Sequence, residues 1–215
     1  MGRIIIDKLV EEGESQVVAL VRGEDAAKEL NALEGVRAIV GDAFDQKTVE
    51  NAMDGCDAAI TTLGGSTSDD DRRIDYEGNN NVIESAGILG VTRIILVSSI
   101  GCGSSKEAAP PSVFEVLKKV LEAKERAENI LIKYYTNSNW TIIRPGGLKS
   151  EPATGTAILT ENNKAIGTIH REDVANLVLQ ALVSPKTERK IFSAIDPAVE
   201  SAVAGELGDV EAFAL

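Results

Sequence analysis

The stretch that decides the fold is Gly2-Arg3-Ile4-Ile5-Ile6-Asp7-Lys8-Leu9-Val10-Glu11-Glu12-Gly13, followed by Val17-Val18-Ala19-Leu20-Val21-Arg22. The first segment has apolar residues at helical spacing and ends at a glycine, which predicts a helix. The second is a short apolar run, which predicts a strand that ends in a basic residue. A helix, a strand and a basic residue form the second half of a dinucleotide-binding βαβ unit.

The first strand of that unit and nearly all of its glycine-rich turn are missing. The turn lets the backbone approach a pyrophosphate at the helix N-terminus, and Gly2 matches its last glycine. In the usual strand order the missing strand lies between 17–21 and 58–62, so we expect a gap or direct pairing there. The chain as written then corresponds to a shortened or mis-started form of a longer protein. We expect it to bind dinucleotides weakly.

Composition favours a single domain over residues 1–215, which is a normal size for one core. The net charge of −12 argues against partners that are nucleic acids or anionic membranes. Cys56 and Cys102 have no framework spacing, which indicates a reducing compartment such as the cytoplasm or the plastid stroma. The single histidine, His170, argues against a zinc site, and no apolar run is long enough for a membrane span.

Strands and helices alternate along the chain, which predicts a Rossmann-like, doubly wound parallel sheet with right-handed crossovers. The predicted strands are 17–21, 36–40, 58–62, 92–99, 140–144 and 190–195. The predicted helices are 4–12, 25–33, 45–53, 75–89, 113–135 and 171–183. The remaining segments are predicted to be loops at 66–73 and 103–111, an irregular stretch at 149–167 and a weakly helical tail at 199–215.

Two strand ends suit the adenosine half of a dinucleotide. Arg22 ends the strand whose tip faces the adenosine ribose, where an arginine favours a 2′-phosphate and therefore NADP over NAD. The alternative is a solvated charge. Asp42 follows the next strand and can accept a hydrogen bond from the adenine amino group, while Asp45 caps the next helix.

Small and polar residues end the strands that follow. Thr62-Leu63-Gly64-Gly65 allows a cofactor to approach the backbone, or forms an ordinary turn. Ser98 and Ser99 lie at the carboxyl edge of the sheet, where ligands bind, although serine also ends strands without a catalytic role. Lys124 lies in a long helix, and helical spacing alone favours a surface pair with Glu128.

One ordered set of segments carries a family resemblance. It comprises 17–22, Gly41-Asp42, Asp75-Tyr76-Glu77-Gly78-Asn79, Val97-Ser98-Ser99-Ile100-Gly101, Lys124 and Ile143-Arg144-Pro145-Gly146-Gly147-Leu148. The set resembles the atypical short-chain dehydrogenase/reductases of the NmrA-like, NAD(P)-binding kind. The nearest group is the plant and cyanobacterial one related to the redox component of the chloroplast translocon. The resemblance runs from residue 2 to about residue 196.

For the adenosine half of the cofactor, the resemblance implies that Arg22 holds the 2′-phosphate of NADP. It implies that Asp42 and Ala43 flank the adenine. Leu63 and Gly64 would line the ribose and the pyrophosphate.

For the nicotinamide half, the resemblance implies that Ser99 takes the position of the family serine, with Ser98 beside it. Lys124 would bind the nicotinamide ribose. Pro145 and Gly146 would approach the nicotinamide ring. Ser99 and Lys124 are thus the candidate catalytic residues.

The chain departs from the family at the acid position. Typical members carry a tyrosine four residues before the lysine, and here that residue is Val120. Tyr134 and Tyr135 lie nearly three helical turns beyond Lys124, so they cannot replace it. A standard alcohol–ketone dehydrogenase is therefore disfavoured. Two hypotheses remain: hydride transfer to a conjugated acceptor, or a non-catalytic protein that senses NADP(H) or docks a partner.

Overall fold

The computed structural model describes residues 1–66, 73–200 and 210–215. The strands are β1 Val17–Val21, β2 Val36–Val40, β3 Ala58–Thr61, β4 Arg93–Val97, β5 Asn139–Pro145, β6 Gly147–Lys149, β7 Ile158–Thr160, β8 Thr168–His170 and β9 Lys190–Ile195. The α-helices are α1 Gly2–Glu12, α2 Glu24–Asn31, α3 Gln46–Met53, α4 Glu77–Leu89, α5 Pro111–Tyr134 and α6 Arg171–Val183. Short 3₁₀ turns cover Gly103–Ala108 and Pro185–Thr187. None of the helices in these ranges is long and apolar enough to cross a membrane.

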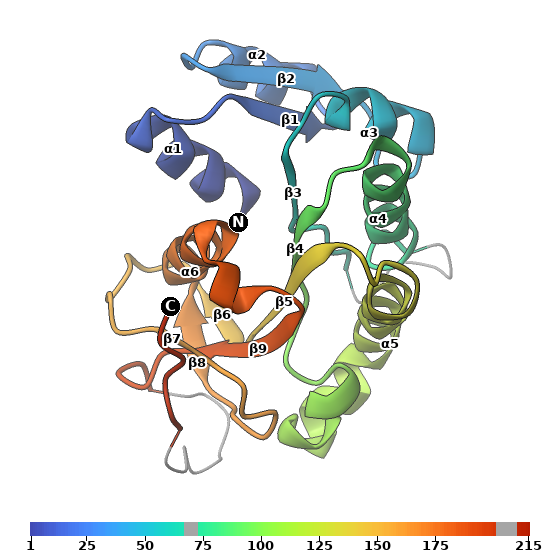
Figure 1. The fold of residues 1–215 in the computed structure, drawn as a ribbon. Coiled ribbons are helices and arrows are strands. Elements are labelled where there is room, and N and C mark those ends of the chain that lie inside the picture. The colour runs from blue at the N-terminus through green and yellow to red at the C-terminus, as the bar shows by residue number, and fades with distance from the viewer. Residues whose placement is uncertain (67–72, 201–209) are drawn as a thin grey trace.

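The strands confirm a mostly parallel Rossmann-like sheet, and they also confirm the expected gap. β1 and β2 form a parallel pair of their own, separate from the five-stranded sheet β3-β4-β5-β9-β7 (Figure 1). β3, β4, β5 and β9 run parallel to their neighbours. β1 and β3 are not paired, so the alternative of direct pairing is wrong.

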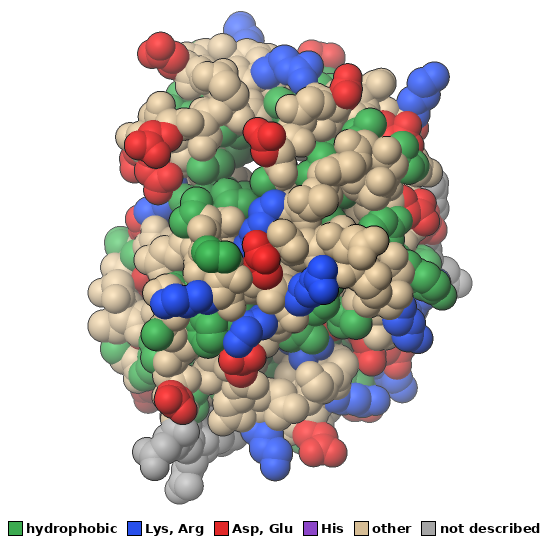
Figure 2. All heavy atoms as spheres, in the orientation of Figure 1, with side chains coloured by type: hydrophobic (Ala, Val, Ile, Leu, Met, Phe, Trp, Pro, Cys, Tyr) green, Lys and Arg blue, Asp and Glu red, His purple; other side chains and the backbone are tan. Residues whose placement is uncertain are grey.

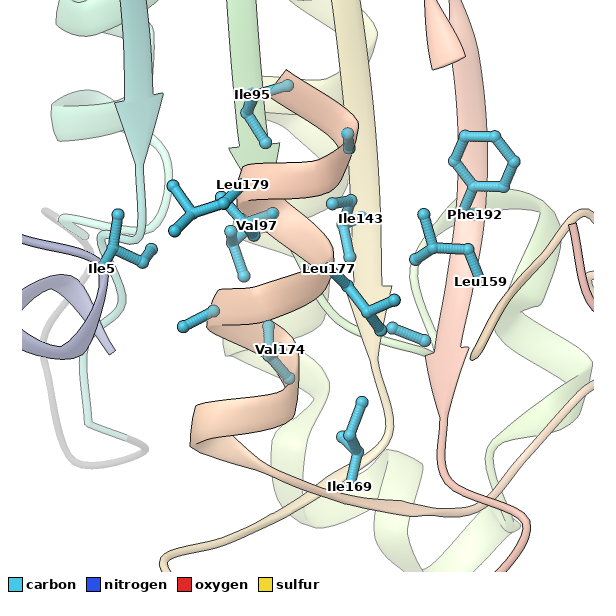
Figure 3. Close-up of a cluster of buried hydrophobic side chains, with 14 residues drawn as sticks. Ile5, Ile95, Val97, Ile143, Leu159, Ile169, Val174, Leu177, Leu179 and Phe192 are labelled. Atoms are coloured by element: carbon cyan, nitrogen blue, oxygen red, sulfur yellow. The ribbon is translucent and has the colours of Figure 1, made fainter. Parts of the chain in front are cut away.

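Two helical layers enclose the strands. On one face, Ile5 of α1 and the buried side of α6 pack against β4, β5 and β9 (Figure 3). On the other face, α3, α4 and α5 pack against β3, β4 and β5 through a second apolar cluster that includes Ile83, Ile94 and Leu131. The central strands are therefore covered on both sides, which explains their nearly continuous apolar sequence.

Both sheets point their carboxyl ends toward the start of α4. Asn81 in this helix donates a hydrogen bond to the carbonyl of Ala43, which follows β2, over 2.8 Å. Asn79, two residues earlier, accepts one from Thr61 at the end of β3 over 2.6 Å. The strand ends before and after the gap therefore lie on one edge of the molecule, which is where ligands bind in open α/β sheets.

Some expectations about the second half of the chain are wrong. The stretch 149–167, expected to be irregular, contains β7, and this strand pairs antiparallel with β9. β6 and β8, which form a small parallel sheet, were not predicted. The segment expected to be a loop at 103–111 contains a 3₁₀ turn. Residues 210–215 of the expected helical tail are not helical, whereas 67–72 and 201–209 lie outside the described residues.

Candidate cofactor site

Lys124 lies at the carboxyl edge of the sheet, because α5 carries it past the end of β3. Its Nζ donates a hydrogen bond to the carbonyl of Leu63 over 2.9 Å and lies 3.6 Å from Oδ1 of Asp75. A Cβ on Gly64 would lie 3.5 Å from the same nitrogen. The expectation of a surface pair with Glu128 is therefore wrong, because tertiary contacts turn Lys124 inward.

Asp75 is the fully buried acid of this cluster, and the sequence analysis gave it no role. Its Oδ2 accepts hydrogen bonds from the backbone N–H of Gly65 and from Arg73, each over 3.1 Å. Asn79 donates to the Asp75 carbonyl over 2.8 Å. Arg73 and Lys124 thus offset one buried carboxylate, and the loop after β3 is held in place. The polar Asp75 and Asn79, four residues apart at the start of a buried helix, were the available signal.

The N-terminus of α1 approaches the same strand end. A Cβ on Gly2 would come within 3.3 Å of the hydroxyl of Thr62, so a larger residue would force a shift. Met1 supplies no side-chain cap, which leaves the first N–H groups of α1 without a side-chain acceptor. A helix N-terminus of this kind attracts anions.

Ser98, Ser99, Pro145 and Gly146 lie together at the neighbouring strand ends. The N–H of Ser98 donates to the Ile143 carbonyl over 2.7 Å, which continues the ladder between β4 and β5. The Ser98 side chain is buried and interacts with the thiol of Cys102, whereas the Ser99 hydroxyl donates to its neighbour's carbonyl. A Cβ on Gly146 would meet the backbone of Gly167 at 2.2 Å, so glycine is required there.

Arg22 and Asp42 end the two strands beyond the gap. The N–H of Gly41 donates to the carbonyl of Val21 over 2.8 Å, which places the two residues at adjacent strand tips. Both side chains are exposed. Asp42 accepts a hydrogen bond from the N–H of Phe44 over 2.9 Å, and the adjacent Ala43 is buried. No hydrogen bond or ion pair joins these two side chains to Lys124 within the described ranges, although all lie on the same edge.

A buried ion pair joins β5 to α5 close to these strand ends. Arg144 of β5 donates from Nε and Nη2 to the two carboxylate oxygens of Glu128 in α5, over 3.0 and 2.7 Å. Its Nη1 donates to the hydroxyl of Ser104 over 2.9 Å. The side chains of the pair are only 3% and 1% exposed, so each charge depends on the other. Sequence spacing gave no sign of this long-range pair.

The described tyrosines do not replace Val120, which lies one turn before Lys124 in α5. Tyr134 is 72% exposed at the end of the helix. Burial and the nearby Glu84 raise the pKa of Tyr135. Tyr76 lies beneath the guanidinium of Arg126, 3.7 Å from the ring centroid. The site therefore has a lysine and serines but no tyrosine acid beside the lysine.

His170, Asp173 and Asp196 form a buried group whose ligand atoms lie within 4.8 Å of one another. Their carboxylates already accept several hydrogen bonds from the segment 154–156 and from Ala198. Burial alone would raise the pKa of Asp196, but hydrogen bonds from Thr154 and Thr156 outweigh it and lower that pKa. We interpret this group as an anchor for the loop.

Neither cysteine suits a nucleophile. Burial, and the charge of Glu128, raise the pKa of Cys102 to about 12, so its thiolate is not formed near neutral pH. Burial also raises the pKa of Cys56. Neither cysteine is therefore a candidate for nucleophilic chemistry at this edge.

Parallel strand ends, a helix N-terminus and a half-buried lysine on one edge define a Rossmann-like nucleotide-binding protein. The chain belongs to the NAD(P)H-binding family, whose model matches residues 1–185. It is also similar to atypical short-chain dehydrogenase/reductases, which confirms the resemblance.

Individual proteins of known sequence or structure are also similar to this chain. An uncharacterized sugar epimerase, YhfK of Bacillus subtilis, is 32% identical over 89% of this chain and 87% of its own. Sanguinarine reductase of Eschscholzia californica is 27% identical over 89% and 83%. Protein TIC 62 of Pisum sativum is 27% identical over 55% and 22%. The structure of ChuY, an anaerobilin reductase of Escherichia coli O157:H7, superimposes with a TM-score of 0.83 at 31% identity, covering 94% of both chains.

Proposed function

We propose that the protein is an NADP(H)-dependent reductase of a conjugated acceptor. The observation that carries this is the position of Lys124, held by Leu63 and Asp75 at the carboxyl edge of the sheet. The close approach of Gly2 to Thr62 fits a dinucleotide on that edge. The cofactor would supply a hydride.

Residues at successive strand ends would each bind a different part of the dinucleotide. Arg22 would pair with the 2′-phosphate, because an arginine offers fork-like donors to phosphate oxygens. Asp42 and Ala43 would border the adenine, and Leu63 and Gly64 the ribose and the pyrophosphate. Lys124 would donate to the nicotinamide ribose, with Ser98, Ser99, Pro145 and Gly146 around the ring.

Val120 restricts the acceptor. With no tyrosine one turn before Lys124, the site has no positioned acid of the usual kind to protonate an alkoxide. A quinone, flavin or bilin spreads the incoming charge and takes its proton from water, so orientation is the main task of the protein. Two relatives named as reductases, for anaerobilin and for sanguinarine, support reduction as the reaction.

The second candidate is a non-catalytic protein of the same fold that senses NADP(H) or docks a partner. Val120 favours it, and so does the likeness to TIC 62. Fluorescence of bound NADPH, followed by a consumption screen against quinones, flavins and bilins, separates the two. Turnover supports the reductase, whereas binding without any turnover supports the sensor. Localisation in the cytoplasm or the plastid stroma stays a prediction, with relatives of both bacterial and chloroplast origin.

Replacing Lys124 tests the nicotinamide side of the site. In Lys124→Met we expect NADPH to bind about 10- to 100-fold more weakly, because a hydrogen bond from a charged donor contributes roughly 1.5–3 kcal/mol. Fluorescence titration of NADPH to millimolar concentration measures the change. The exposed Lys119→Met, on the same helix, is the matched control. If the two variants bind NADPH with equal affinity, Lys124 does not contact the cofactor.

Replacing Arg22 tests the choice between NADP and NAD. In Arg22→Glu we expect NADPH binding to weaken at least about tenfold while NADH binding stays within about twofold, since NADH carries no 2′-phosphate. Arg37→Glu changes an exposed arginine on the neighbouring strand and should leave both unchanged. A parallel loss for both dinucleotides in Arg22→Glu would show that this side chain does not read the 2′-phosphate.

A further inference from the structure

His170, Asp173 and Asp196 bring three side chains that can ligate a metal together in the interior. They come from the end of β8, from the first turn of α6 and from the residue after β9, and they are only 8%, 2% and 0% exposed. One ligand atom of each lies within 4.8 Å of the other two. On the face that Figure 2 shows, by contrast, acidic side chains lie at the surface among basic ones.

The two buried carboxylates have no basic side chain to balance them. Among the described residues, neither Asp173 nor Asp196 forms an ion pair with a lysine or an arginine. Their hydrogen bonds come from neutral donors, which are the N–H groups and threonine hydroxyls of 154–156 and the N–H of Ala198. Two like charges this close inside a protein repel each other, so the pair requires a cation or a proton beside it.

His170 directs one ring nitrogen at this pair. Its Nδ1 is buried, has no hydrogen-bond partner in the described part of the chain, and lies 3.7 Å from Oδ2 of Asp173. Its Nε2 lies 3.7 Å from a carboxylate oxygen of Glu151. A histidine that binds a metal commonly directs its second nitrogen at a carboxylate, which orients the ring and leaves the first nitrogen as the ligand. The ring therefore has the orientation of a metal ligand.

The three groups also have free electron pairs and access from outside. Asp173 accepts from the N–H groups of Thr154 and Gly155 and from the Thr154 hydroxyl, while Asp196 accepts from two threonine hydroxyls and one N–H. That leaves one of about four lone-pair positions free on each carboxylate. Ligand atoms about 2.1 Å from one ion lie roughly 3.4 Å apart, so each atom needs to move by less than about 1 Å. A cavity of about 320 Å³, which Asp173, Gly155 and Gln180 help to line, lies beside the group.

We propose that His170, Asp173 and Asp196 bind one divalent metal ion through Nδ1 and one oxygen of each carboxylate. A first-row transition ion such as Mn²⁺ suits this set, because carboxylates alone favour Mg²⁺ or Ca²⁺ whereas an imidazole favours a transition metal. The ion would join the end of β8 and the start of α6 to the end of β9. Through the hydrogen bonds of the two carboxylates it would also fix the segment 153–156, which follows β6.

Titration of the 215-residue chain with Mn²⁺, followed through the electron paramagnetic resonance signal of the free ion, tests the proposal. We expect one ion to bind per chain. A concentration of about 1 mM Mn²⁺ should raise Tm by about 5 °C, because the ion binds only the folded state. His170→Ala removes the nitrogen ligand and should weaken binding at least about tenfold. The exposed Asp54→Asn removes one acidic charge elsewhere and should bind Mn²⁺ as the unchanged chain does.

Nuclear magnetic resonance on the unchanged chain locates the ion without any substitution. Because Mn²⁺ is paramagnetic, it should broaden the amide signals of 153–156 and 196–198 first and leave those of β2 sharp. Three results would overturn the proposal: no saturable binding, equal affinity of His170→Ala and Asp54→Asn, or broadening that starts at exposed acids such as those of 54–57. In the first case a proton on His170, and not a metal ion, would balance the two carboxylates.

Discussion

Joining an apolar five-residue strand and a six-residue glycine-rich turn ahead of Met1 is expected to tighten NADPH binding at least about tenfold. Gly2 begins α1 beside Thr62, so a strand placed between β1 and β3 would end next to the start of this helix. The turn would add backbone donors around the pyrophosphate, and about 1.4 kcal/mol of added interaction is a factor of ten. Fluorescence titration of both forms measures the ratio.

The same extension is expected to raise the free energy of unfolding by about 2 kcal/mol or more, which corresponds to roughly 4–8 °C in Tm at this size. A matched extension with the same strand, but with serine in place of each glycine of the turn, separates the two effects. It should keep the gain in Tm and lose most of the gain in NADPH affinity. If the original and extended chains bind NADPH with equal affinity, the added turn does not contribute to binding of the pyrophosphate.

Glu128→Gln is expected to lower the free energy of unfolding by about 3 kcal/mol or more. The substitution leaves the guanidinium of Arg144 buried without its counter-charge, and breaking such a pair costs about 3–5 kcal/mol. Urea unfolding followed by circular dichroism gives the value. The exposed Glu122→Gln, on the same helix, should cost less than about 0.5 kcal/mol.

The double variant Glu128→Leu with Arg144→Met gives the sharper comparison. Replacing both charges with apolar side chains of similar volume should recover most of the lost stability, because no unpaired charge then remains buried. If the single and double variants unfold at the same urea concentration, the loss comes from packing around the helix and not from the unpaired arginine.

The sequence predicted the long elements because their apolar patterns are strong. All six predicted strands and all six predicted helices exist, with ends shifted by a few residues. The gap also followed from the pattern at residues 2–22. β6, β7 and β8 were not predicted, because a strand of three residues is too short to show an alternating pattern. Their positions depend on partners that are distant in sequence.

The candidate site was only partly accessible to sequence reasoning. Strand ends pointed to Arg22, Asp42 and Ser98, because parallel strands bring their carboxyl ends to one edge. Helical spacing paired Lys124 with Glu128, whereas each has a long-range partner in the fold. Contacts that join a helix to a loop some sixty residues away leave no local pattern, so the position of Lys124 beside Leu63 could be found only in the structure.

The break between β1 and β3 also bears on how the molecule opens. The region of β1, α2 and β2 is attached to the rest through helix packing and chain connections, not through a shared ladder of backbone hydrogen bonds. Such a region can detach as a cooperative unit at a free energy below that of global unfolding. Limited proteolysis is then expected to cut first within the region of β1, α2 and β2, while the segment that contains β4, β5 and β9 stays intact.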